Sequence, residues 1–296
     1  MDDVTWLTAA FEEHRGHLRA VAYRMLGSVG EAEDAVQDAW LRASRADTGA
    51  VENIGGWLTT VVARVCLNAL RSREQRREDP LESRIPDPVV TAESGADPEK
   101  QALLADSVGL AMLVVLESLA PAERVAFVLH DMFAVPFDEI APMLEKTPAA
   151  TRQLASRARR RVQGQAPAPD PDLSRQRLVV DAFFAAAHDG DFGALVSVLH
   201  PDVVLRSDGG IARTRYTVTV RGAEVVAGQA TGFSRFAPFA IPALVNGAAG
   251  VVVAADGHPL SVMAFTVTDG LIASIDVLAD PERLAALDLA VVPGRD

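Results

Sequence analysis

The chain has 296 residues, 49% of them hydrophobic, and a formal net charge of -12. This composition predicts a globular protein of two or three domains and excludes a largely disordered chain. A single cysteine excludes disulfide scaffolds and cysteine-based zinc sites, and we expect neither a signal peptide nor a membrane span, so the expected location is the cytoplasm.

Three helices are predicted in the first quarter of the chain. Residues 5–26 and 31–43 have helical periodicity, with Gly27 and Gly30 between them. The stretch "NIGGWLTTVVARVCLNALRSR" places an apolar stripe at spacings of three and four, which predicts a third helix capped by Asn53. Cys66 lies among apolar neighbours in this helix, so we interpret it as a buried small side chain.

Residues 79–98 are rich in proline and acidic residues, which predicts a linker. Helical periodicity resumes at residues 99–118 and continues after Pro121. Over residues 137–162, a short helix, a turn at 145–147 and a second helix predict a helix-turn-helix. Thr147 can cap the second helix, whereas Pro142 inside the first helix and Glu145 in the turn depart from an ideal motif.

The second helix of this motif concentrates arginine in an otherwise acidic protein. Thr151, Ala155 and Val162 share its apolar face. The opposite, polar face and its edge carry Arg152, Gln153, Ser156, Arg157 and Arg160. Arginine and glutamine side chains can read guanine and adenine edges in a major groove, and we expect Arg157 and Arg159 to flank this face towards phosphates. The pattern predicts a DNA-recognition helix, and the alternative is a solvated arginine face.

The C-terminal part of the chain changes in pattern after the proline-rich stretch 164–172, which predicts a second linker. A helix is expected at 173–187. Short alternating runs separated by glycine turns then predict an α+β domain, with one curved antiparallel sheet and a helix or two on its face.

The first half resembles the small, extracytoplasmic-function sigma factors of bacterial RNA polymerase. "EAEDAVQDAWLRA", residues 31–43, resembles the helix with which that group docks on the clamp of the largest β-type polymerase subunit, and "GGWLTTVVARVCLNALRSR" resembles the helix that reads the minus-ten promoter element. The resemblance implies a polymerase-binding set of Asp34, Gln37, Asp38 and Arg42, and a minus-ten set of Thr60, Arg64, Asn68 and Arg71. It also implies that the helix-turn-helix reads the minus-thirty-five element.

The remainder resembles a SnoaL-like domain of the NTF2-like cone fold, which extends one subgroup of these sigma factors. The resemblance rests on Ser207–Gly210, on Asp280–Leu284 and, in the linker, on Arg84–Pro88. It implies regulation in cis, with regulatory contacts at Asp208, Gly209, Gly210, Asp280 and Arg283.

The resulting domain map is: sigma domain 2 at 1–78, a linker at 79–98, sigma domain 4 at 99–163, a linker at 164–172, and the NTF2-like domain at 173–290. Two alternatives to a sigma factor stay open: a ligand-sensing regulator of duplex operators, and an NTF2-like isomerase or cyclase using Asp208, His200 or Asp276 as a base. We expect no metal or cofactor, because no cluster has ligand spacing. An apolar cone is empty, filled by its own side chains, or occupied by a small molecule.

Overall fold

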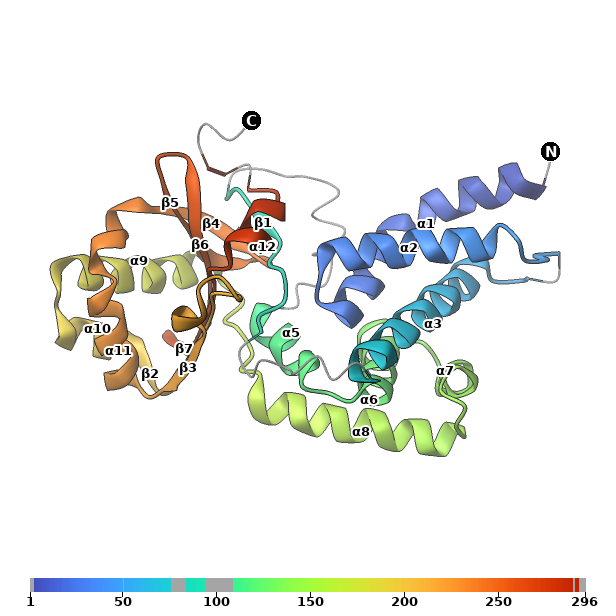
Figure 1. The fold of residues 1–296 in the computed structure, drawn as a ribbon. Helices are drawn as coiled ribbons and strands as arrows, with labels where there is room; N and C mark the ends of the chain where they lie inside the picture. The colour runs from blue at the N-terminus through green and yellow to red at the C-terminus, as the bar shows by residue number, and fades with distance from the viewer. Residues whose placement is uncertain (1–2, 50, 76–83, 94–108, 290, 293–296) are drawn as a thin grey trace. The chain divides into compact units, whose positions relative to one another are not determined.

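The computed structural model describes residues 3–49, 51–75, 84–93, 109–289 and 291–292. Its elements divide into two compact units (Figure 1). One unit comprises residues 1–79, 101–105 and 115–165, and the other comprises 80–100, 106–114 and 166–296. Most of the two predicted sigma domains therefore lies in one unit, whereas residues 99–100 and 106–114 and most of the predicted linker 79–98 belong to the other. The domain boundaries given above stay predictions.

The first unit begins with three helices that pack on one another, α1 (Asp3–Leu26), α2 (Val29–Ala43) and α3 (Ile54–Gln75). Each begins or ends where the sequence offers a cap: Ser28 accepts from the Glu31 amide, and Asn53 accepts from the Gly56 amide at 3.0 Å, as predicted. Leu58, Val62 and Cys66 are fully buried, so the interpretation of Cys66 as a core residue is confirmed. Burial raises the pKa of its thiol to about 12.

Five further elements follow: α5 (Leu110–Glu117), α6 (Pro121–Phe127), the π-helical turn η1 (Val128–Met132), α7 (Phe137–Met143) and α8 (Pro148–Gln165). The predicted helix-turn-helix is confirmed as α7 and α8, with Pro142 inside α7. Glu145 has φ of 55° in the turn, the conformation that glycine adopts more easily. The part of the predicted helix 99–118 before residue 109 lies outside the described residues.

A buried arginine joins these two groups of helices. Arg124 in α6 is 3% exposed and donates to the backbone oxygen of Met25, near the end of α1, at 2.9 Å. It also pairs with Glu117 at 3.0 Å. Beside it, the guanidinium of Arg24 lies 4.9 Å from the ring centre of Phe133. The helix-turn-helix region is therefore held against α1 by a polar contact that is shielded from water.

The second unit contains a seven-stranded sheet in the order β1-β4-β5-β6-β7-β2-β3. The strands are β1 (Val90–Thr91), β2 (Leu199–Asp208), β3 (Val218–Arg221), β4 (Ala240–Val245), β5 (Ala248–Ala255), β6 (His258–Thr268) and β7 (Leu271–Leu278). The expectation of a purely antiparallel sheet is wrong at one place, because β2 and β7 pair in parallel, with Leu205 beside Ile275. The α+β fold class is confirmed.

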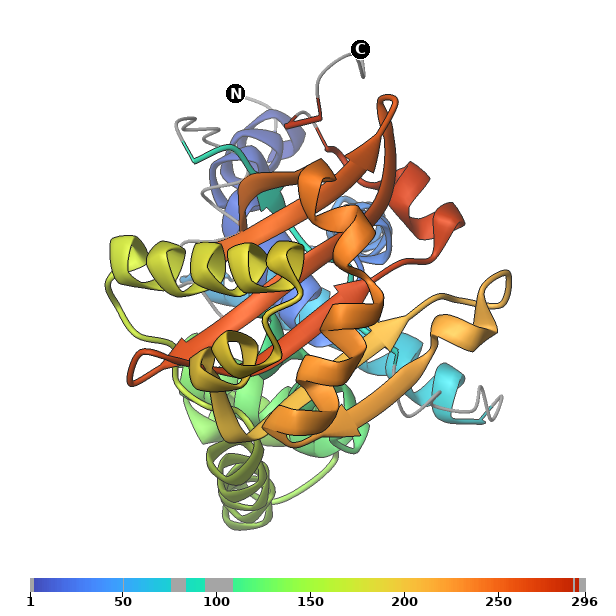
Figure 2. The ribbon, with the colours of Figure 1, turned by 90° about the vertical axis from the view of Figure 1, so that its left-hand side faces the viewer.

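One face of this sheet is covered by helices, as Figure 2 shows, where α9 (Leu173–Asp189) and α11 (Ala223–Gly232) cross the strands. The short helix α10 (Phe192–Val198) lies with them. Their buried side chains and those of the strands form one apolar core that includes Phe183, Leu195, Val226, Phe265 and Ile275. The helices and the sheet of this domain therefore share one apolar core.

Most of both predicted linkers belongs to this unit, whereas residues 164–165 of the second are the end of α8. Residues 90–91 of the first linker form the edge strand β1, which pairs with β4. In the second linker, the Asp170 amide donates to the Val267 oxygen at 2.7 Å, and the Asp170 carboxylate accepts from the amides of Asp269 and Gly270 in the β6–β7 turn. Neither linker is a free spacer over its described residues. All described helices are too short or too polar to span a bilayer.

Candidate nucleic-acid interface

The predicted recognition helix α8 has the two faces expected of it. Thr151, Ala155, Ala158 and Val162 are buried. Arg152, Gln153, Arg157 and Arg160 are exposed, and Ser156 is partly exposed. Thr147 accepts from the Ala150 amide at 3.2 Å and caps the helix. The structure therefore places all five candidate residues for the minus-thirty-five element on the solvent side of one helix.

Two arginines of the same helix form ion pairs within the protein. Arg159, expected to reach phosphates, donates from Nε to the Asp131 carboxylate at 2.7 Å. Arg161 contacts Glu123 at 3.5 Å. Both carboxylates lie before the helix-turn-helix, so these pairs position α8 on its own domain. Arg159 thus has an anionic partner within the protein, and its expected contact with phosphates stays a prediction.

The candidate minus-ten residues lie on α3, opposite its buried side. Arg64 and Asn68 are exposed, and Thr60 and Arg71 are partly exposed. The Thr60 hydroxyl donates its hydrogen to the Gly56 carbonyl oxygen at 3.0 Å. The Thr60 hydroxyl oxygen can therefore only accept a hydrogen bond from another molecule. The end of this helix and the residues after it carry four arginines, Arg71, Arg73, Arg76 and Arg77. Arg73 pairs with Glu31 and donates to the Leu26 oxygen. Arg76 and Arg77 lie outside the described residues.

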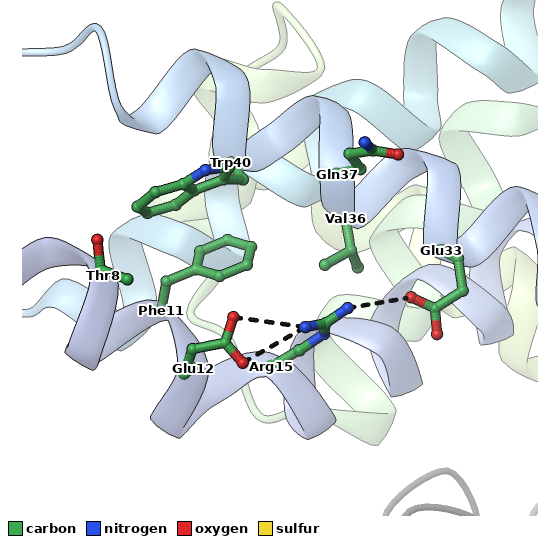
Figure 3. A pocket seen from close by; sticks show the side chains of 8 residues that line it. All are labelled: Thr8, Phe11, Glu12, Arg15, Glu33, Val36, Gln37 and Trp40. Carbon is green, nitrogen blue, oxygen red and sulfur yellow. Dashed lines mark hydrogen bonds and ion pairs between the residues drawn. The ribbon is translucent and has the colours of Figure 1, made fainter.

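The candidate polymerase-binding residues Asp34, Gln37, Asp38 and Arg42 are all exposed on α2. Beside them, a cavity of about 390 Å³ opens between α1 and α2 (Figure 3). One wall is apolar, formed by Val36 and by the rings of Phe11 and Trp40, whose centroids are 5.0 Å apart. The opposite wall is charged, formed by Glu12, Arg15 and Glu33, with Arg15 between the two carboxylates. Gln37 belongs both to this cavity and to the candidate polymerase face.

The candidate regulatory residues meet around one buried carboxylate. Asp208, at the end of β2, is 3% exposed. It accepts from Arg283 NH1 at 2.8 Å and from the Ile85 amide of the first linker at 3.2 Å. Arg283, on α12 (Pro281–Ala286), also pairs with Asp87 of the linker and donates to the Ile85 oxygen. We call Ile85, Asp87, Asp208 and Arg283 the linker clamp.

The two glycines after Asp208 are required by close packing. A side chain on Gly209 would place its Cβ 2.3 Å from the Arg213 oxygen. On Gly210, which has φ of 62°, the Cβ would lie 2.1 Å from an oxygen of Asp280. Asp280 in turn accepts from the Glu282 amide and caps α12, the helix that carries Arg283. The five predicted regulatory residues therefore form one connected structure.

Sequence reasoning missed the other contacts that hold the linker. Val89 and Asn246 exchange two hydrogen bonds of 2.8 and 3.0 Å. Arg177 of α9 donates to Glu93 at 2.6 Å and to the Ala243 oxygen of β4 at 2.8 Å. The only local signal was the Val89–Thr91 run of strand-forming residues inside an otherwise proline-rich stretch.

The candidate catalytic bases have structural partners. Asp276 is 1% exposed and pairs with Arg206 at 2.9 Å; burial raises the pKa of its carboxyl despite that guanidinium. The His200 ring accepts from the Asp202 amide at 3.1 Å, and Asp208 belongs to the linker clamp. Over the part of the chain that the structure describes, no three His, Cys, Asp or Glu side chains gather as metal ligands.

Comparison with known proteins identifies two family regions in the first half of the chain and relatives that span nearly all of it. Residues 10–77 match the family model of Sigma-70 region 2, and residues 110–162 match that of Sigma-70 region 4. The ECF RNA polymerase sigma factor SigJ of Mycobacterium tuberculosis is 42% identical over 294 residues, which cover 94% of this chain and 93% of SigJ. Its relative SigI, a probable ECF sigma factor of the same species, is 36% identical over 95% of this chain and 96% of its own length.

The crystal structure of M. tuberculosis SigJ is similar over nearly the whole molecule. It matches with a TM-score of 0.76 and 37% identity, covering 95% of this chain and 99% of SigJ. The chain thus contains sigma regions 2 and 4, followed by an α+β domain. Its relatives align with it over nearly their full length. The chain belongs to the extracytoplasmic-function family of RNA polymerase sigma factors.

Proposed function

We propose that the C-terminal domain of this sigma factor controls promoter-directed initiation in cis by fixing the path of the linker between regions 2 and 4. The observation that carries the proposal is the linker clamp, in which Arg283 joins Asp208 of the sheet to Ile85 and Asp87 of the linker.

The linker matters because the two sigma regions read separate promoter elements. Region 2 ends near residue 77 and region 4 begins near residue 110, so the intervening chain is the covalent tether between them. Residues 84–93 are bound to the C-terminal domain along their length, by the clamp, by β1 and by Arg177. A linker that is bound along its length allows a narrower range of separations between regions 2 and 4 than a free linker of equal length.

The same proposal assigns DNA and polymerase contacts. On α8, the exposed face of Arg152, Gln153 and Arg160 supports major-groove readout of the minus-thirty-five element. On α3, Arg64 and Asn68 support contact with the minus-ten element. On α2, the exposed charges beside the cavity support docking on the polymerase clamp.

The clamp is tested by transcription from promoters of different spacing. Run-off transcription with purified core polymerase compares promoters in which the distance between the two elements is changed by one base pair at a time, or about 3.4 Å. The wild type is expected to have a sharp spacing optimum. Asp87→Ala removes the linker's carboxylate and leaves the Asp208–Arg283 pair in place, so it is expected to change the yield at the optimum and broaden the profile.

Two further variants complete the design. Arg283→Ala leaves Asp208 buried without its cation, which should release the linker more completely. Arg175→Ala, an exposed arginine on α9, is the matched control and should behave as wild type. If Asp87→Ala and Arg283→Ala both keep the wild-type yield and spacing profile, control through the linker is excluded while the sigma function stands.

A further inference from the structure

The C-terminal domain has a local reversal of charge. Residues 211–239 contain four arginines and one acidic residue, Glu224. The rest of the C-terminal half, residues 164–210 and 240–296, contains five arginines against fourteen acidic residues. The segment therefore carries net positive charge on an acidic domain, and nothing in the linker clamp accounts for it.

Aromatic rings lie between the charges of this segment. Tyr216, at the end of the 3-10 turn η2 (Thr214–Tyr216), and Phe233 have ring centroids 6.0 Å apart. Phe233 is followed by Phe236, in η3 (Ser234–Phe239), with centroids 6.2 Å apart. The guanidinium of Arg215 lies 4.8 Å from the Tyr216 ring centre, and that of Arg235 lies 4.7 Å from the Phe236 ring centre. We call these five residues the arginine–aromatic cluster.

The cluster is both anchored and accessible. Phe236 packs against the apolar core of the domain, which fixes the position of the row of rings. Phe233, in the middle of the row, is 43% exposed, and both arginines are exposed. Among the described residues, no carboxylate lies within ion-pair distance of Arg215 or Arg235. Two cations free of acidic partners therefore flank an open aromatic face.

This combination fits one class of partner. Exposed rings stack with bases, and flanking arginines contact phosphates, which is how proteins bind single-stranded nucleic acid without strong sequence preference. A duplex would use the arginines but not the rings, because its bases are already stacked. An acidic peptide would likewise leave the face of Phe233 unused.

We propose that the arginine–aromatic cluster binds single-stranded nucleic acid, with a base on Phe233 and phosphates at Arg215 and Arg235. A sigma factor works where DNA strands are opened and RNA is begun, so the strand is either opened promoter DNA or the new transcript. This site is separate from the proposed linker control, and its test needs no polymerase, so either proposal can fail alone.

The binding test uses the full chain with fluorescent oligo(dT) and oligo(rU), measured by anisotropy over a range of salt concentrations. Phe233→Leu keeps an apolar side chain but removes the stacking face, and is expected to weaken binding about fivefold or more without changing the salt dependence. The double variant Arg215→Gln and Arg235→Gln is expected to lower the slope of log K against log salt by about 0.7 for each lost phosphate contact. Arg175→Gln, an exposed arginine away from these rings, should change neither quantity.

Regions 2 and 4 also meet DNA, so the site is located directly by ultraviolet cross-linking to the same oligonucleotides and mapping of the peptides. Cross-links within residues 214–239 that disappear in Phe233→Leu support the proposal. Tighter binding of oligo(dT) identifies opened DNA as the source, and tighter binding of oligo(rU) identifies the transcript.

Three results would overturn it: cross-links confined to α3 and α8, wild-type affinity and salt slope in both cluster variants, or equal competition by polyglutamate, which would indicate an acidic protein partner. The arginine variants are at exposed positions, so they stay folded and keep the test valid if Phe233→Leu does not fold.

Discussion

Arg124 provides a sharp test of how the helix-turn-helix region is attached to α1. We consider Arg124→Met, which keeps a long side chain at a site that is 3% exposed but removes the guanidinium. The variant loses the bond of 2.9 Å to the Met25 oxygen and the bonds of 3.0 and 3.4 Å to Glu117. The carbonyl of Met25 then has no cationic donor.

The size of the effect follows from burial. A hydrogen bond to a charged group contributes about 1.5–3 kcal/mol, and breaking a buried ion pair costs about 3–5 kcal/mol. The Glu117 side chain is 27% exposed, so water can hydrate its carboxylate after the change. We therefore expect a loss of about 2–3 kcal/mol of unfolding free energy, within the range for a charged hydrogen bond and below that for a fully buried ion pair.

The assay is urea unfolding of the full chain followed by tryptophan fluorescence. The three tryptophans, Trp6, Trp40 and Trp57, all lie in the first unit, so the signal reports on the part that contains Arg124. The control is Arg15→Met, whose ion pair with Glu12 is half exposed and should be worth under about 1 kcal/mol. If Arg124→Met costs no more than this control, the buried contact does not hold the unit together.

Three other perturbations have defined outcomes. Replacing Arg152 or Arg160 by Ala should cost about 1–3 kcal/mol of discrimination at one position of the minus-thirty-five element in a binding assay on mutated promoters; unchanged selectivity would remove these residues from base readout. Gly210→Ala forces a Cβ to within 2.1 Å of the carboxylate that caps α12, so hydrogen exchange in β2 should accelerate, whereas Gly228→Ala, with open space around its Cβ, should not affect it. Because burial raises the pKa of Asp276, its contribution to stability is complete below about pH 4, the unfolded value, and is lost as pH rises through the folded pKa. Asp276→Asn should therefore flatten that fall in the unfolding free energy above about pH 4, and an unchanged slope would contradict the assignment.

The helices could be predicted because their signals are local. In α3 and α8 the apolar side chains recur every three or four residues, and Asn53 and Thr147 cap them as expected. The exposed faces that carry Arg64 and Arg152 follow directly from that periodicity. Their contacts with DNA do not, and stay predictions.

The long-range contacts could not be predicted from the residues alone. Parallel pairing of β2 with β7 joins Leu205 to Ile275, and no local pattern specifies it. The resemblance to known sigma factors singled out Asp208 and Arg283, but their meeting with Asp87 of the linker is visible only in the folded chain. Arg159 is a second example, since the sequence lists it among several arginines and only the folded chain shows its ion pair with Asp131.

The edge strand β1 also determines whether the C-terminal domain resists aggregation when it is produced as a separate fragment. β1 is supplied by residues before region 4 and covers the outer edge of β4, with Val90 beside Val245. A fragment that starts after α8 would lose the β1 pairing at Leu244 and Val245 and expose that edge of β4, and an exposed edge pairs readily with other chains. We therefore expect that fragment to aggregate or form intermolecular sheets, and a peptide of residues 84–93 added in trans to suppress both.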